Sequence, residues 1–154
     1  HWALAKLSKA FHYSSSRKEP SHLSLDQSRA ISTENSPAAL GPYSQAIEVD
    51  GWVYCSGQIP IVPGDGSIKR GIQDQAQQAL SNLGEVLKAA GCELSDVVKT
   101  QVYLSDMGDF AAVNEVYAGF FCEPFPARVC IQAAALPKGV DVEVDAIARK
   151  RDSR

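Results

Sequence analysis

The spacing of apolar residues alternates between two periods along the chain, and this alternation constrains the fold more than any other feature. Apolar side chains recur at every second position in several short segments, as in strands, and at every third or fourth position in two longer segments, as in helices. From residue 30 onward the predicted order is strand, strand, helix, strand, helix, strand, strand. This order is typical of an α+β fold.

The first two strands lie in SQAIEVDGWVYCSG, residues 44–57. Asp50-Gly51 separates them, and Asp-Gly is a strong signal for the two-residue turn of a β-hairpin. Residues 58–71 contain three glycines and two prolines and predict a loop. Its Gly64-Asp65-Gly66 extends to no nucleotide-binding glycine motif, so turn chemistry explains these glycines.

Two amphipathic segments predict the helices. The first covers residues 72–90 and repeats apolar side chains at three- and four-residue steps, with Gly91 as its stop. The second covers about 109–121, since two prolines soon follow and prevent its continuation. A strand at 96–104 separates them, so both helices are expected on one face of a largely antiparallel or mixed sheet. The other face then needs a cover, and a second copy of the chain is the expected one.

The last two strands, residues 127–135 and 140–148, flank the turn sequence LPKG and predict a second hairpin. A simple hairpin register places Glu143 opposite Gln132, unless a β-bulge shifts the pairing. Arg128 then lies about four residues, or roughly 13 Å, from Glu143. This separation is too long for a salt bridge and leaves Arg128 available for an anionic ligand.

Side chains of these strands alternate between two faces. An apolar set is expected to face the core: Val129, Ile131 and Ala133 in the first strand, and Val140, Val142, Val144 and Ala146 in the second. A polar set is expected on the opposite face: Arg128, Cys130, Gln132, Asp141, Glu143 and Asp145. The simplest explanation of the polar face is a solvated surface with weak ion pairs, and a ligand-binding cleft is the alternative.

Histidine occurs only at His1, His12 and His22. The rest of the chain therefore cannot form a Ser-His-Asp or Cys-His catalytic pair or a His-rich zinc site. Four widely spaced cysteines, Cys55, Cys92, Cys122 and Cys130, form no C-x-x-C pair, which disfavours structural zinc. Acid–base chemistry must then use Glu, Asp, Tyr, Cys, Lys, backbone groups or water. The cysteine pattern favours a reduced, intracellular protein.

Charge is distributed unevenly. The whole chain carries −3, and residues 1–29 carry +3 from five cations and two acids, so the remainder carries −6. An acidic body disfavours nucleic acid as the main partner, because such binding neutralises several phosphates with Lys and Arg. No apolar run reaches the length of about 18 residues that a membrane span needs.

The first 29 residues differ from the rest, since HWALAKLSKAFHYSSSRK contains no acid and is rich in Ser, Lys and Ala. This composition fits a mitochondrial or plastid transit peptide, and a leader added for expression is the alternative. The expected organisation is an N-terminal extension at 1–29, one domain at 30–149 and a tail at 150–154. Cytoplasmic and mitochondrial locations both stay open.

Four segments together resemble the RidA (YjgF-type) reactive-imine deaminase family across about residues 30–149. They are STENSPAALGPYSQAI (32–47), YCSGQIPIVP (54–63), VVKTQVYLSDMGDFAAVNEVYAGFF (97–121) and FPARVCIQAAALPKGVDVEVDAIA (125–148). The resemblance implies a chorismate-mutase-like α+β fold and a homotrimer with a central barrel of three sheets, outer helices and clefts at the subunit interfaces. It implies hydrolysis of 2-imino or enamine acids such as 2-aminoacrylate to 2-keto acids and ammonia, with no cofactor or metal.

The resemblance also implies roles for individual residues. Arg128 is expected to hold the substrate carboxylate, and Glu143 to orient or activate the hydrolytic water. The backbone carbonyl of Cys130 is expected to help hold that water. The remaining positions are expected to line the cleft: Tyr43, Ser56, Gly57 and Asn114. Asn114 has an equally simple explanation as a polar position on its helix.

Two other functions stay open at this point. The same cleft could serve a non-catalytic small-metabolite-binding protein or a chaperone-like trimer. Relatives in this family are also associated with RNA cleavage and translation inhibition, which the acidic, histidine-free body makes physically weaker.

Overall fold

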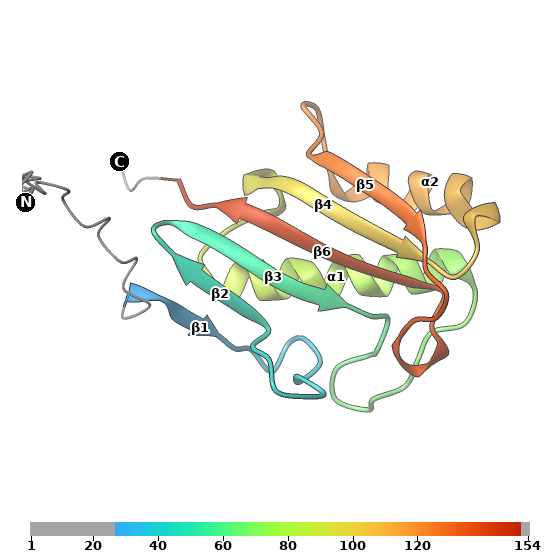
Figure 1. Ribbon diagram of the computed structural model, residues 1–154, viewed down its shortest axis with the longest axis horizontal. Helices are drawn as coiled ribbons and strands as arrows, with labels where there is room; N and C mark the ends of the chain where they lie inside the picture. Colours follow the sequence, from blue (N-terminus) through green and yellow to red (C-terminus); the bar gives the residue numbers. More distant parts are fainter. Residues whose placement is uncertain (1–26, 152–154) are drawn as a thin grey trace, which may run out of the picture.

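Residues 27–151 are described in the computed structural model, where they form a six-stranded mixed sheet with two long helices on one face (Figure 1). The strand order is β1-β2-β3-β6-β4-β5. The elements are β1 (Arg29–Ile31), β2 (Ala46–Val49), β3 (Trp52–Gln58), α1 (Ile72–Ala89), β4 (Val97–Leu104), α2 (Phe110–Phe120), β5 (Ala127–Gln132) and β6 (Val142–Arg149). The predicted α+β class is confirmed. Most of the expected N-terminal extension, and part of the expected tail, lie outside the described residues.

The local signals of the sequence produce the expected elements. Asp50 and Gly51 both have positive φ, at 50° and 77°, which is the backbone of the turn that joins β2 to β3. Gly91 has φ 78° and follows the end of α1, where its N–H bonds the carbonyl of Lys88. Both features place a residue in the left-handed region where the chain must reverse.

The core lies between the sheet and the two helices. α1 buries Leu83, Val86 and Leu87 completely, and β6 contributes alternate residues such as Val142 and Val144. This alternation of β6 confirms the predicted apolar face of that strand. Burial of each such side chain stabilises the fold by roughly 1.5–3 kcal/mol.

The predicted hairpin of the last two strands is wrong, and so is the pairing of Glu143 with Gln132. β5 pairs parallel to β4, whereas β6 pairs antiparallel to both β3 and β4, so β4 lies between β5 and β6. The reason is the helix that precedes β5. The β4–α2–β5 segment is a crossover unit, which places β5 parallel to β4 at the edge of the sheet, and β6 then occupies the other side of β4.

This topology also reverses the predicted faces of β5. Cys130 packs against the core cluster on the helix side, and Arg128 shares that side because it pairs in register with the fully buried Thr100. Val129 and Ile131 are 40% and 47% exposed on the opposite, helix-free side. An apolar strand pattern identifies a buried face only where the sheet face it occupies is covered, and this face is uncovered in the single chain.

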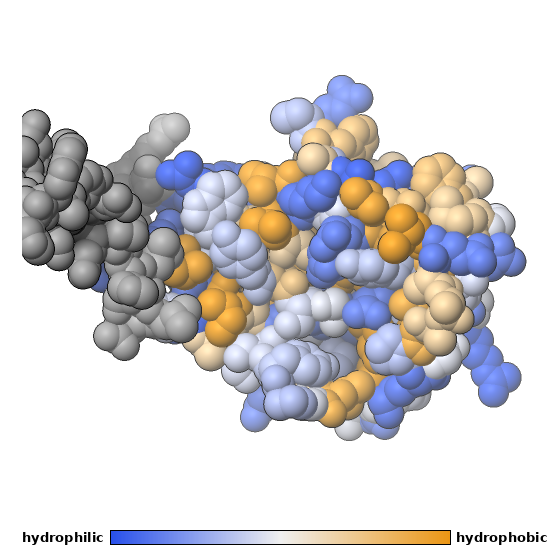
Figure 2. All heavy atoms as spheres, in the orientation of Figure 1, coloured by the Kyte–Doolittle hydropathy of each residue, from blue (hydrophilic) through white to orange (hydrophobic). Residues whose placement is uncertain are grey.

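The helix-free face is toward the viewer in Figure 1, and Figure 2 shows in the same orientation that apolar and polar side chains are interleaved across it. It carries the exposed apolar residues Tyr54, Val129 and Ile131 and the half-buried Glu143 and Asp145. β1, a short strand that pairs antiparallel with β2, extends the sheet beyond the predicted strands. Among residues 27–151, no helix is long and apolar enough to cross a membrane.

Candidate functional site

Four of the seven predicted site residues lie together at one cavity of about 450 Å³. Its wall combines the loop before β2, the C-terminal half of β3, the turn before β6, and β6 itself. The lining residues are Leu40, Gly41, Pro42, Tyr43, Ser56, Gly57, Ile59, Pro137 and Glu143. We call this cavity the carboxylate pocket, because Glu143 is the one carboxylic acid among the described residues that line it.

A β-bulge in β3 brings its backbone against Glu143. The pairing of β3 with β6 shifts register between Cys55 and Gln58, so Ser56 and Gly57 lie in the irregular part of the strand. An ideal Cβ on Gly57 would lie 1.8 Å from Oε1 of Glu143. Gly57 therefore leaves the space that the Glu143 carboxylate occupies.

The loop that carries Tyr43 is fixed by a buried glutamine. The side-chain amide of Gln45 donates to the carbonyls of Thr33, Ser36 and Pro37, and its oxygen accepts from the N–H of Thr33. The hydroxyl oxygen of Tyr43 accepts from the N–H of Leu40 at 3.0 Å. The phenolic proton is then free to be donated toward the cavity, where the ring is about half exposed.

Glu143 is a half-buried carboxylate with no hydrogen bond or ion pair to any residue within 27–151. Burial raises the pKa of the Glu143 carboxyl above its ordinary value, and the nearby negative charge of Asp145 raises it further. Asp145 itself accepts hydrogen bonds from Gln101 at 3.1 Å and Tyr103 at 3.4 Å. A desolvated, unpartnered carboxylate with a raised pKa is suited to accept a proton near neutral pH.

Arg128 and Asn114 lie at a different cavity, of about 330 Å³, between α2 and the start of β5. Its lining residues are Asn114, Tyr117, Ala118, Phe125, Pro126 and Arg128, and we call it the arginine pocket. Arg128 forms no ion pair with any described residue. Its guanidinium lies over aromatic rings, which leaves its N–H groups available for an anion.

Cys130 lines neither pocket, and its thiol and its backbone lie in different surroundings. Burial raises the pKa of the Cys130 thiol, and the charge of Arg128 opposes this only in part. The N–H of Ala133 bonds the carbonyl of Leu104, so the odd-numbered residues of β5 direct their backbone groups toward β4. By strand alternation, Arg128 and Cys130 direct theirs toward the free edge of the sheet, where a ligand or a water can reach them.

The carboxylate pocket and the arginine pocket do not form one site within a single chain. Glu143 lies in register with Tyr103 and Ile131 on the helix-free face, whereas Arg128 lies in register with Thr100 on the helix face. Two strand spacings of ~4.8 Å and three residues of ~3.3 Å separate their Cα atoms by about 14 Å. The expectation that Arg128 and Glu143 form no direct pair therefore holds, for a reason other than the predicted hairpin register.

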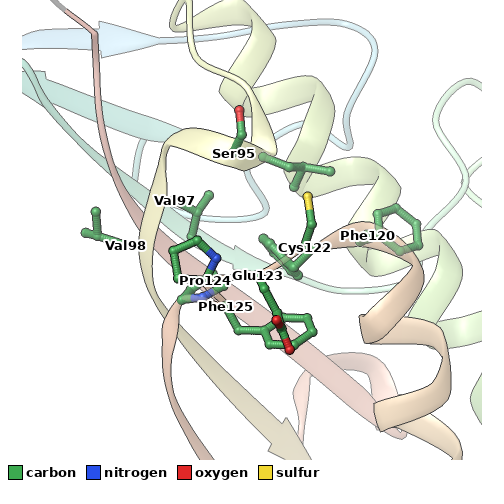
Figure 3. Close-up of a pocket in the computed structure, with 11 residues that line it drawn as sticks. Ser95, Val97, Val98, Phe120, Cys122, Glu123, Pro124 and Phe125 are labelled. Carbon is green, nitrogen blue, oxygen red and sulfur yellow. The ribbon is translucent and has the colours of Figure 1, made fainter.

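A further cavity of about 450 Å³ lies between the start of β4 and the segment that follows α2 (Figure 3). Phe120, Phe125, Val97 and Val98 make its wall largely apolar, and the thiol of Cys122 points into it. No predicted site residue lines this cavity. Its ionisable groups, Glu123 and Cys122, include no cation that could hold a carboxylate.

Sequence reasoning missed the apolar walls of both pockets. Leu40, Ile59 and Pro137 line the carboxylate pocket, and Tyr117 and Phe125 line the arginine pocket. The turn-forming Gly-Pro-Tyr and Leu-Pro-Lys-Gly segments were the available signal, since binding residues concentrate on loops held by a rigid scaffold. Lys138 in the second turn has φ 56°, an uncommon value for a residue other than glycine.

Comparison with known proteins matches nearly the same part of the chain that the structure describes. Residues 33–150 match the protein family described as endoribonuclease L-PSP. A mouse protein named 2-iminobutanoate/2-iminopropanoate deaminase is 53% identical over 121 residues, which cover 78% of this chain and 90% of the mouse protein. The Salmonella typhimurium protein of the same name is 46% identical over 127 residues, covering 80% of this chain and 99% of that protein.

Solved structures show the same fold. RidA from an Antarctic Psychrobacter has a TM-score of 0.78 at 44% identity and covers 79% of this chain and 99% of its own. The E. coli protein TdcF, crystallised with bound serine, has a TM-score of 0.77 at 42% identity and covers 80% of this chain and 99% of its own.

Proposed function

Since the chain belongs to the endoribonuclease L-PSP family, which includes the RidA-type deaminases, we propose that it hydrolyses reactive 2-imino and enamine acids to 2-keto acids and ammonia. The observation that carries the proposal is the chemistry of its two pockets. One presents a partly desolvated carboxylate at Glu143 and the other a guanidinium at Arg128, and neither group forms an ion pair within residues 27–151. A 2-imino acid has a carboxylate that Arg128 can bind, and its hydrolysis needs a water that Glu143 can activate.

The reaction needs few groups. Water adds to the electrophilic iminium carbon, a proton leaves the water, and the resulting carbinolamine expels ammonia as the carbonyl forms. An enamine acid first takes up a proton at its β-carbon and becomes the imine. The protein contributes mainly by orienting the acid and the water and by accepting one proton, so the proposal calls for no cofactor or metal.

Arg128 is assigned to the substrate carboxylate. A guanidinium makes two parallel charge-assisted hydrogen bonds to a carboxylate, each worth roughly 1.5–3 kcal/mol. The serine bound to TdcF is a small amino acid with a carboxylate, similar in size to a 2-imino acid. Its binding supports a site for small carboxylates in this fold. Glu143 is assigned to the water, which the free-edge carbonyl of Cys130 helps to hold.

The two pockets are proposed to meet across the interface of a homotrimer. The helix-free face of each chain, with Val129 and Ile131 exposed, packs against other copies so that three sheets form a central barrel. Arg128 and Asn114 of one copy then face Tyr43, Ser56, Gly57 and Glu143 of its neighbour. This arrangement explains why an arginine and a carboxylate that must act on one small molecule lie on opposite faces of one sheet.

The location of this activity is part of the proposal. Four cysteines without a disulfide partner favour a reducing compartment, so we place the enzyme in the cytoplasm or in a mitochondrion.

The decisive experiment generates 2-aminoacrylate with a pyridoxal-phosphate-dependent dehydratase and measures keto-acid formation with and without this protein. Wild-type protein should accelerate keto-acid release, and Arg128→Ala should abolish the acceleration. Arg70→Ala, which removes an exposed arginine from the loop before α1, is the matched control and should retain full activity.

Other results would assign other functions. Saturable binding of a keto acid without acceleration of hydrolysis would indicate a metabolite-binding protein. Undiminished activity in Arg128→Ala would remove the carboxylate assignment. RNA cleavage that survives repurification and disappears in Arg128→Ala or Glu143→Gln would replace the deaminase proposal with a nuclease.

A further inference from the structure

The side chain of Arg128 rests on two aromatic rings of α2. Its guanidinium carbon lies 4.8 Å from the ring centre of Tyr117 and 5.5 Å from that of Phe110, both within the range of a cation–π interaction. Arginine has a long, flexible side chain, and β5 is an edge strand that gives it a neighbour on one side only. The two rings restrict where the guanidinium lies.

The ring of Tyr117 is itself held in place from two directions. Its hydroxyl is 2.7 Å from the hydroxyl of Thr100, which is fully buried. The ring of Tyr117 also packs against the ring of Phe121, with the two ring centroids 4.5 Å apart. Tyr117 is only 5% exposed, and burial raises the pKa of its hydroxyl, so it stays a neutral hydrogen-bonding group.

These contacts form a closed chain. Thr100 is the register partner of Arg128 on β4, and Tyr117 of α2 touches both residues. Any buried tyrosine hydroxyl needs a polar partner, and Thr100 supplies it; the guanidinium over the ring is the contact that filling the core does not require. Here one end of the side chain is anchored on the sheet, and its ring supports the one guanidinium that the proposed reaction uses.

We propose that Tyr117 is a positioning residue that fixes the guanidinium of Arg128 for the substrate carboxylate, with Phe110 as a secondary support. This inference rests on the proposed function and adds the residue that pre-orders its binding group. With its carbon over the two rings and no ion pair to a described residue, the guanidinium keeps N–H groups available for the two parallel bonds that a carboxylate accepts. The cost of ordering the arginine is met on folding rather than on binding.

The proposal separates the ring from the hydroxyl. Tyr117→Leu removes the ring, and we expect KM for the imino acid to rise about tenfold with a much smaller change in kcat, because the carboxylate contact is shared by ground state and transition state. Tyr117→Phe keeps the ring and should raise KM only about two- to threefold. Thr100→Val should resemble Tyr117→Phe, and Thr100→Ser, which keeps a hydroxyl, should restore wild-type values.

Two controls distinguish positioning from damage to the core. Phe120→Leu makes the same aromatic-to-aliphatic change in the same helix, but Phe120 lines the cavity of Figure 3 and not the arginine pocket. It should leave KM unchanged. In an Arg128→Ala background, Tyr117→Leu should cause no further loss of affinity for a 2-keto acid measured by calorimetry, because it acts only through the arginine.

The outcomes separate this inference from the function beneath it. A wild-type protein that fails to accelerate imine hydrolysis would refute the deaminase proposal, and calorimetry with 2-ketobutanoate on correctly assembled Tyr117→Leu would still test the role of Tyr117. An active wild type with an unchanged KM in Tyr117→Leu would overturn the positioning role. So would an equal loss of affinity in the presence and absence of Arg128.

Discussion

Glu143 and Gly57 are two residues that act as one unit at the residue scale. The carboxylate occupies the volume that any side chain on residue 57 would need, at 1.8 Å from an ideal Cβ. Gly57 is therefore required because it has no side chain. From the sequence alone, the family resemblance could suggest only that Gly57 lines the cleft. The nature of its contribution, space for the carboxylate, is visible only once β6 lies beside the bulge of β3.

Gly57→Ala should displace the Glu143 carboxylate and lower kcat/KM for imine hydrolysis by about 100-fold, since a shift of about 1 Å in a catalytic group has effects of that size. The coupled 2-aminoacrylate assay measures it. Gly84→Ala in α1 is the control, because a Cβ there meets nothing within 4 Å. It should leave activity intact and raise stability by about 0.5–1 kcal/mol. Full activity in Gly57→Ala would show that Glu143 need not lie where it does.

The second prediction at the residue scale concerns Asp145, whose charge affects the pKa of the neighbouring Glu143. Burial and the charge of Asp145 raise the pKa of Glu143 above its ordinary value of 4.5. A general base works when deprotonated, so kcat/KM should fall as pH decreases through this raised pKa. Asp145→Asn removes one of the two causes and should shift the acidic limb of the pH profile to lower pH. An unmoved limb would exclude Glu143 as the group that titrates.

The elements show where sequence patterns determine structure and where they do not. The β2–β3 hairpin and both helices were predictable within one or two residues, because Asp50-Gly51, Gly91 and the helical periodicity act locally. The position of β6 in the sheet was not predictable, because β6 pairs with β3 and β4, which are distant in the sequence, and not with the preceding strand β5. The faces of β5 were predicted wrongly for a related reason. Its apolar side chains, Val129 and Ile131, occupy the sheet face that the single chain leaves uncovered.

Asn82 connects two elements and gives a prediction at this scale. Its amide group donates to the carbonyls of Ile59 and Ile61 at 3.0 and 2.8 Å, which ties the loop after β3 to α1. Asn82 is 1% exposed, so Asn82→Ala should leave these carbonyls unsatisfied and lower the free energy of unfolding by about 2–4 kcal/mol.

Urea denaturation at one fixed protein concentration measures the loss. Asn114→Ala, on the rim of the arginine pocket, should change stability by less than about 0.5 kcal/mol. Equal effects of the two substitutions would contradict the structural role of Asn82.

At the scale of the whole molecule, six of the seven predicted site residues line one of two pockets, and Cys130 lines neither. Tyr43, Ser56, Gly57 and Glu143 lie at one pocket, and Arg128 and Asn114 lie at another. No periodicity in one chain can show that two faces of the same sheet serve one reaction. In the proposed trimer that relation belongs to the assembly, so only a resemblance could lead to its expectation.

The proposed assembly predicts complementation between two inactive variants. In mixed trimers of Arg128→Ala and Glu143→Gln chains, each mixed trimer contains one interface with both an intact arginine and an intact glutamate. Refolding an equimolar mixture should therefore restore about a quarter of wild-type activity, from three-quarters mixed trimers with one of three sites intact.

The control replaces Glu143→Gln by the double variant Arg128→Ala/Glu143→Gln, in which no trimer contains an intact arginine, and it should stay inactive. Full inactivity of the first mixture, with mixed trimers verified by mass spectrometry, would place both groups of a site on one chain.

The placement of Arg128 and Glu143 on opposite faces of the sheet also has a kinetic consequence. If the proposed trimer forms the site, a chain that has folded but not yet met its partners holds two half-sites, and we expect newly made protein to be inactive toward its substrate. Specific activity should then decline on dilution, as the trimer dissociates, while the fold of each chain persists. The amount of working enzyme depends on the concentration of the chain more steeply than in direct proportion.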